Sequence, residues 1–173
     1  MIIRLIVLYG LYMGISLLHE GGHRLFLAWG HYSVKDWRIG SAPWILRGRR
    51  WRMGIVPGVS QVKVQEPIRK VGHRLGMSLS GVGLVAIVTG IVGSLLWSVA
   101  PIILVFGGTT ICLDMMPWPP IMDGAKTMSA LKQSVPGSLH LMHGLCILEG
   151  VLMGMGTVLG LLLMIHWAAT GRI

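Results

Sequence analysis

LIVLYGLYMGISLLHEGGH, residues 5–23, joins an uncharged apolar run to a His-Glu motif, HEGGH at positions 19–23. On a helix, the pattern H-E-x-x-H places two imidazoles four residues apart on one face, with a carboxylate beside them. A hydrolytic zinc site needs this arrangement. Because residues 5–18 carry no charge, the stretch predicts a metal site at one end of a membrane helix.

The spacing of the motif defines what each side chain can do. His19 and His23 are separated by about 400° of helical rotation, so they diverge by only about 40° and both can reach one metal ion. Glu20 lies about 100° away, where it can contact a metal-bound water without being a ligand. Zinc lowers the pKa of such a water to about 7, and the carboxylate can then accept its proton. A chance match is the alternative, but a charge at membrane depth costs roughly 2.5–3.5 kcal/mol, and a metal site explains why Glu20 is there.

The composition is that of a membrane protein. Hydrophobic residues make up 53% of the 173 residues and charged residues 12%, about half the charged share of a soluble domain. We predict a single domain, residues 1–173, that is an all-α polytopic membrane protein with about four transmembrane helices. The predicted spans lie near residues 2–26, 75–99, 102–116 and 139–168. The first apolar stretch lacks a small-residue cleavage site, so we expect it to be retained.

The basic residues gather in one loop. Of the fifteen Lys and Arg, eleven lie within residues 24–74, which predicts a cytoplasmic loop by the positive-inside rule. The N- and C-termini are then expected outside, with the HEGGH motif and Asp123 at the same depth toward the cytoplasmic face. The net charge of +9 also suggests nucleic acid. No recognition-helix or aromatic stacking pattern is present, so we expect no nucleic-acid partner.

The loop at about residues 31–74 predicts a membrane-associated β-hairpin between the first and second helices. Residues 34–46 and 51–64 hold β-branched and aromatic residues, with a turn at residues 47–50 between them. Pro43, Pro57 and Gly58 favour edge-strand or bulge positions for parts of these strands. A hairpin beside the bilayer either offers an edge for an extended peptide or is only an amphipathic surface, and periodicity favours neither alternative.

A catalytic zinc needs a third protein ligand besides the two histidines. Asp123 is the best candidate, because it follows the third predicted span and has the depth of the histidine pair. Pro117, Pro119 and Pro120 would break the helix there and let the chain turn back to the site. The alternative role for Asp123 is a helix N-cap, which spacing alone slightly favours.

Other polar residues in or near the predicted spans compete with Asp123. Asp114 lies in the third span and could line the site. Cys112 and Cys146 lie in apolar segments and predict buried thiols, not a disulfide framework. The remaining candidates for a metal ligand are His140, His143 and Glu149.

HEGGH, together with PWPPIMDG at residues 117–124, resembles the site-2 protease family of intramembrane zinc metalloproteases. That family pairs HExxH with an Asn-Pro…Asp-Gly segment whose Asp is the third zinc ligand, so the resemblance makes Asp123 a ligand. WRMGIVPGVSQVKV, residues 51–64, resembles the family's membrane-embedded β-hairpin, and SGVG, residues 80–83, is similar to the start of its next span. Asp114 stands in place of the family's Asn.

The resemblance implies a zinc-dependent intramembrane endopeptidase of a bacterial or archaeal plasma membrane. Zn²⁺ would be held by His19, His23 and Asp123, with Glu20 as the catalytic base. The substrate would be a transmembrane protein or membrane peptide, cleaved within or beside the lipid bilayer. We expect it to pair as a strand with the hairpin near residues 51–64. The predicted substrate contacts are Val56, Pro57, Gly58, Val59, Ser60 and Asp114.

With 173 residues we expect a minimal member of the family, without a PDZ-like or nucleotide-binding regulatory domain. Two other functions remain open at this point. One is a non-catalytic membrane adaptor of the same fold that binds client helices without cutting them. The other is a metal transporter, which would need polar residues along several spans.

Overall fold

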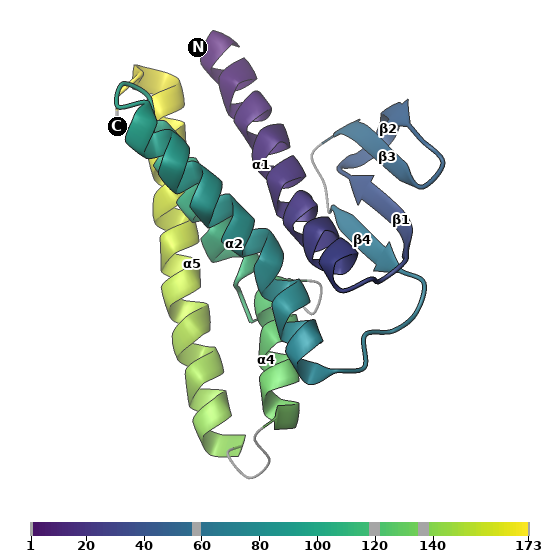
Figure 1. Ribbon diagram of the computed structural model, residues 1–173. Coiled ribbons are helices and arrows are strands. Elements are labelled where there is room, and N and C mark those ends of the chain that lie inside the picture. Colours follow the sequence, from purple (N-terminus) through teal and green to yellow (C-terminus); the bar gives the residue numbers. More distant parts are fainter. Residues whose placement is uncertain (1, 57–59, 118–121, 135–138, 173) are drawn as a thin grey trace.

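The computed structural model describes residues 2–56, 60–117, 122–134 and 139–172, and it is mostly helical with one small sheet (Figure 1). Three helices are long and apolar enough to cross a membrane: α1 (Ile2–Trp29), α2 (Val71–Leu95) and the His143–Thr170 part of α5 (Leu139–Thr170). Two shorter helices, α3 (Ala100–Asp114) and α4 (Asp123–Ser134), lie between α2 and α5 in the sequence. The prediction of a mostly helical fold is confirmed, and three helices in the described ranges are candidate membrane spans, where four spans were expected.

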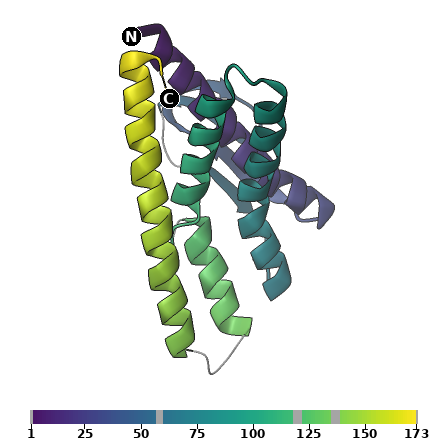
Figure 2. The same ribbon diagram turned by 90° about the vertical axis from the view of Figure 1, so that its left-hand side faces the viewer.

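The predicted third span is short because the chain bends after Asp114. Helix α3 has 15 residues, which is about 22 Å of helix, against about 30 Å for the hydrocarbon core. The chain resumes as α4, so that α3 and α4 follow one another along α5 (Figure 2). Gly124 permits this tight bend, because a Cβ atom there would lie 2.0 Å from the carbonyl oxygen of Met115. The predicted third span is therefore interrupted. Asp114 lies at the end of α3, before the bend, and Asp123 lies at the start of α4, after it.

The other predicted boundaries are close to the observed ones. Helix α2 begins and ends four residues before the predicted span 75–99. Its end comes earlier because the chain turns at residues 96–99 ahead of Pro101. Helices α1 and α5 continue to Trp29 and Thr170, slightly beyond the predicted ends at residues 26 and 168.

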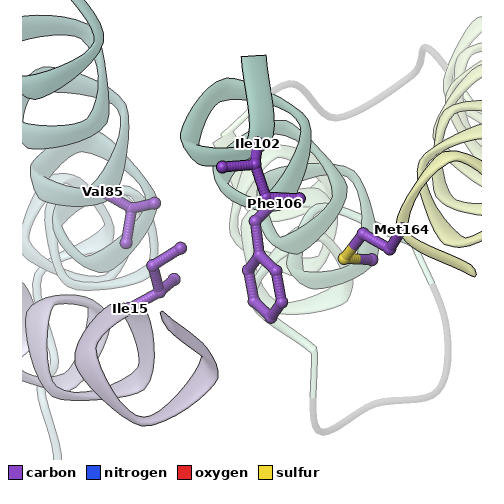
Figure 3. Close-up of a cluster of buried hydrophobic side chains, with 5 residues drawn as sticks. All are labelled: Ile15, Val85, Ile102, Phe106 and Met164. Atoms are coloured by element: carbon purple, nitrogen blue, oxygen red, sulfur yellow. The ribbon is translucent and has the colours of Figure 1, made fainter. Parts of the chain in front are cut away.

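Helices α1 and α2 cross at close distance, and four of the helices share one apolar cluster. The close approach of α1 to α2 depends on Gly22, where a Cβ atom would lie 2.3 Å from the backbone oxygen of Ser80. At this crossing, the second half of α1, which carries the HEGGH motif, packs against α2. Buried side chains from α1, α2, α3 and α5 form the core in Figure 3: Ile15, Val85, Ile102, Phe106 and Met164.

The two chain ends lie at the same end of the molecule (Figures 1 and 2). The Arg4 guanidinium of α1 donates hydrogen bonds from Nη1 to the carbonyl oxygens of Ala168 and Ala169 in the last turn of α5, at 3.2 and 3.0 Å. These bonds satisfy carbonyl groups that the end of a helix leaves without an intrahelical partner.

The loop between α1 and α2 forms a four-stranded sheet beside α1, in the order β2-β3-β1-β4 (Figure 1). Strands β2 (Ser41–Arg47) and β3 (Trp51–Val56) form an antiparallel hairpin, and the turn predicted at residues 47–50 lies at residues 48–50. The prediction missed that each long strand is divided in two. Gly40, with φ of 68°, ends β1 (Val34–Ile39), which then lies parallel to β3 and antiparallel to β4 (Gln61–Val64).

Strand β3 is an inner strand of this sheet. Its neighbours β2 and β1 occupy both of its sides, so peptide pairing along residues 51–56 is excluded. Within the predicted range 51–64, the strand with a free edge in the described sheet is β4. Asp36 reinforces the pairing of β1 with β3, since its Oδ2 accepts from Arg38 at 2.6 Å and from Arg52 at 3.2 Å. The Tyr9 hydroxyl of α1 donates to the carbonyl of Ile55, which holds the sheet along the helix.

Candidate metal centre

Three side chains from two helices converge at a buried point. His19 and His23 come from α1, and Asp123 is the first residue of α4. The Nε2 atoms of the histidines lie 3.0 Å apart, and they lie 3.2 and 2.9 Å from Oδ2 of Asp123. All three residues are at most 9% exposed. In the described part of the chain, these three are the cluster able to hold a metal ion, and they are the ligands that the sequence predicts.

The separations fit a tetrahedral metal ion. Ligand atoms about 2.0–2.1 Å from zinc at tetrahedral angles lie about 3.3 Å from one another. The three ligand-atom separations in the structure are slightly shorter than this, at 2.9 to 3.2 Å. Oδ2 of Asp123 is buried and makes no hydrogen bond to the described residues, so a cation between the three atoms would supply its missing partner. Two imidazoles and a carboxylate form a donor set that can hold a divalent transition metal, Zn²⁺ among them, and leave a further position open.

Contacts behind the two rings turn their Nε2 atoms toward Asp123. Nδ1 of His23 lies 2.7 Å from the carbonyl oxygen of Met77 and 3.3 Å from the Ser80 hydroxyl. An Nδ1–H that donates to this carbonyl leaves the Nε2 lone pair free for a metal. Nδ1 of His19 lies 3.2 Å from Oδ2 of Asp114, an ion-pair distance without the alignment of a hydrogen bond. Asp114 therefore contacts the predicted ligand His19 on the Nδ1 side of its ring, opposite the Nε2 atom that faces Asp123.

The two carboxylate oxygens of Asp123 face different partners. Oδ1 accepts from Lys126 Nζ at 2.7 Å while Oδ2 faces the histidines. The orientation of Oδ2 toward both imidazole rings favours the ligand interpretation of Asp123 over the helix cap.

Glu20 lies next to the histidines in the sequence but outside the group of three. It is 4% exposed, and its Oε2 has no hydrogen-bond partner among the residues that the structure describes. A buried carboxylate oxygen without a donor has unused capacity to accept a proton or a hydrogen bond. Water at the open metal position is the group that this oxygen could take a proton from.

Gly81 of α2 lies directly against the two imidazole rings. A Cβ atom at this position would lie 2.8 Å from Nε2 of His23 and 2.9 Å from Cε1 of His19. If the cluster holds a metal ion, Gly81→Ala should displace the rings and weaken its binding by at least about tenfold, the loss typical of disturbed ligand orientation. Gly83→Ala is the matched control, because no atom lies within 4 Å of a Cβ there. Zinc titration against a competing chelator measures both, and equal affinities would contradict the close packing.

Five of the six predicted substrate contacts lie outside the metal-binding group or outside the described residues. Val56 ends β3, and Pro57, Gly58 and Val59 fall outside the described residues. The Ser60 hydroxyl accepts from the backbone N–H of Gly40 at 3.1 Å, which ties the start of β4 to the bend after β1. Among the six predicted contacts, Asp114 is the one that the structure places at the metal centre.

Two of the competing ligand candidates on α5 lie outside the cluster. Glu149 and His143 are outside the described metal-binding group, and His143 is exposed. The side chain of His140 is not among those described. Cys112 and Cys146 are free thiols, but both are half-buried, where buried thiols were predicted.

Sequence reasoning missed three contributors to the site. Lys126 follows Asp123 by three residues, a spacing that brings side chains together on a helix, so this partner could have been found. The contacts of the Met77 carbonyl and of Gly81 with the histidine rings depend on how α1 crosses α2. No local sequence pattern predicts such contacts.

Comparisons with protein-family models, curated proteins and solved structures found no match to this chain. A functional interpretation therefore rests on the motifs and on the geometry of the centre.

Proposed function

We propose that the chain is a zinc-dependent intramembrane endopeptidase that cleaves a transmembrane or membrane-proximal segment of a protein substrate. The observation that carries this proposal is the buried convergence of His19, His23 and Asp123 beside Glu20, on a helix of spanning length. The donor set, the open position and the adjacent carboxylate together match the requirements of metal-assisted hydrolysis. The resemblance of the motifs to site-2 proteases supports the same conclusion.

Each residue then has a role in hydrolysis. Zn²⁺ held by His19, His23 and Asp123 would polarise the scissile carbonyl and acidify a water molecule. Glu20 accepts a proton from this water as the water oxygen bonds to the carbonyl carbon. Glu20 then gives the proton to the amide nitrogen as the C–N bond breaks. Each turnover consumes one water and produces one new carboxyl group and one new amine.

We propose that α1, α2 and α5 span the membrane and that α3 and α4 form an interrupted fourth crossing. The two ends of the basic loop, Lys126 and Lys132 then lie on the cytoplasmic side, and both termini lie outside. Strand β3 of the loop reaches along α1 into the membrane as far as Tyr9. The hydrogen bonds from Arg4 to the last turn of α5 support a common side for the termini. This topology places the metal centre in the cytoplasmic half of the membrane.

The free edge of β4 is the proposed partner of the substrate. Peptide bonds in a helix are shielded by their own hydrogen bonds, so a membrane segment must unwind before cleavage. An edge strand offers the donors and acceptors that an unwound segment needs. The hydrogen bond from Tyr9 to Ile55 supports a position of the sheet along α1. An unwound substrate segment in the membrane could then reach the edge of the sheet.

Cleavage in proteoliposomes tests the proposed function. Purified chain is mixed with a library of single-span peptides, and the products are identified by mass spectrometry. We expect pairs of products whose masses sum to the substrate plus one water. Removal of zinc with 1,10-phenanthroline should stop the reaction, and added zinc should restore it. Cleavage that continues after metal analysis shows no bound metal would contradict a metalloprotease.

We further propose that Asp114 orients His19 through its Oδ2, which lies 3.2 Å from Nδ1 and would accept the Nδ1–H after a small change in alignment when metal binds. Asp114→Leu removes the acceptor at similar side-chain size, and we expect it to lower zinc affinity about 10- to 100-fold. Asp114→Asn keeps an acceptor oxygen and should retain most of the affinity. Competition with a zinc chelator gives both constants. If both variants bind zinc like the unmodified chain, or both lose it equally, Asp114 does not act as the acceptor.

A further inference from the structure

A cavity of about 340 Å³ lies between α2 and α4, next to the metal centre but outside it. Its size is within the range of small-ligand sites. The lining combines two cations, two hydroxyls and two small apolar side chains from two different helices. These residues are Arg74, Ser78, Ala125, Lys126, Ser129 and Ala130.

The cations that line the cavity have unused binding capacity. Arg74 donates from Nη2 to Oε1 of Gln133, but its Nε is buried and has no acceptor among the described residues. Lys126 uses one of its three N–H donors on Asp123 and remains half exposed. A buried guanidinium N–H without an acceptor is unfavourable, and an anionic oxygen in the cavity would supply both the acceptor and the opposite charge.

The position of the cavity indicates where such an anion would come from. Arg74 lies in the first turn of α2, where the basic loop meets a helix of spanning length. In the topology proposed above, this is the level of the cytoplasmic lipid headgroups. Basic pockets between membrane helices on that side recognise lipid phosphates. The hydroxyls of Ser78 and Ser129 add donors for phosphate oxygens, and Ala125 and Ala130 leave apolar wall for the glycerol carbons.

We infer that this cavity binds an anionic phosphate group, supplied by the headgroup of an acidic membrane phospholipid. Arg74 and Lys126 hold the phosphate from opposite helices, and the two serines complete its hydrogen bonds. The inference rests on the proposed membrane topology and not on proteolysis, so its test measures binding alone.

Purified full-length chain in nanodiscs of neutral phosphatidylcholine, doped with phosphatidylglycerol, provides the test. Native mass spectrometry counts the lipids that the chain retains. We expect one phosphatidylglycerol per chain, held in preference to phosphatidylcholine. Arg74→Gln should lower this affinity by about tenfold, because it removes a charge-assisted hydrogen-bond donor. Ser129→Leu, which fills the cavity from an exposed helix position without changing charge, should lower it similarly.

Arg69→Gln is the matched control. It removes the same charge from an exposed residue five positions earlier, outside the cavity lining, so it should change the affinity less than about twofold. Equal losses in Arg74→Gln and Arg69→Gln would overturn the site, since the attraction would then be non-specific. Equal retention of the two lipids by the unmodified chain would also overturn it.

A second arm separates the two sources of phosphate. Inorganic phosphate is titrated into chain held in pure phosphatidylcholine nanodiscs. Saturable binding that Arg74→Gln abolishes, without any preference for phosphatidylglycerol, would support the phosphate site and overturn its lipid source. Displacement of phosphatidylglycerol by an acidic peptide at the same concentration, with equal dependence on Arg74, would assign the cavity to substrate and overturn the inference.

Discussion

Asp123→Ala is expected to lower the zinc affinity of the chain by more than about 100-fold. The substitution removes one of three protein ligands, and losses of only the supporting contacts around a ligand already reach 10- to 100-fold. It also leaves Lys126 without its carboxylate and the two Nε2 atoms without the oxygen that they face. Competition with a chromogenic chelator measures the change.

Two further variants make this prediction specific. Asp123→Asn retains a good N-cap side chain, so a capping role predicts little effect on either folding or zinc. A ligand role predicts a large loss of zinc, because a neutral amide replaces the carboxylate. Glu149→Ala removes the competing candidate on α5 and should leave zinc affinity unchanged. Zinc loss in Glu149→Ala together with zinc retention in Asp123→Ala would contradict the assignment of the third ligand.

Glu20→Gln is expected to reduce peptide cleavage by about 10²- to 10⁴-fold while zinc content stays at the level of the unmodified chain. Glutamine has nearly the same size as glutamate but cannot accept the proton of the attacking water. The rate is measured in proteoliposomes with a cleavable single-span peptide, and zinc is measured on the same preparation.

Glu149→Gln is the matched control for this experiment, since it makes the same chemical change on α5, outside the metal-binding group. It should leave both cleavage and zinc content unchanged. A Glu20→Gln chain that cleaves at the original rate would remove Glu20 from the chemistry. A Glu20→Gln chain that loses its zinc would instead show that Glu20 is needed to form the centre.

Local spacing predicted one side of the candidate site. His19 and His23 are four residues apart on a continuous apolar helix, and helical geometry alone places their rings together. Asp123 lies a hundred residues later, and its spacing slightly favoured a helix cap. Its role as a ligand came from the resemblance of the motifs, and the convergence of its Oδ2 on both Nε2 atoms now supports it.

Long-range contacts explain what the sequence could not predict. Dividing the loop into four strands depends on the positive φ of Gly40 and on the parallel pairing of β1 with β3, which joins residues that are not neighbours along the chain. The third span ends early because α3 stops at Asp114, and Gly124 allows the chain to return close to Met115. The contact of Asp114 with His19 follows from that bend, so the residue's place at the centre could not be read from its spacing alone.

The X-ray absorption spectrum of the zinc-loaded chain tests the proposed centre most directly. We predict scattering from two imidazole rings and one carboxylate oxygen at about 2.0–2.1 Å from zinc, with a further light atom in the open position. Sulfur scattering at about 2.3 Å, which would place Cys112 or Cys146 on the metal, would contradict a centre built from His19, His23 and Asp123. A chain that binds no zinc at micromolar concentration would contradict it as well.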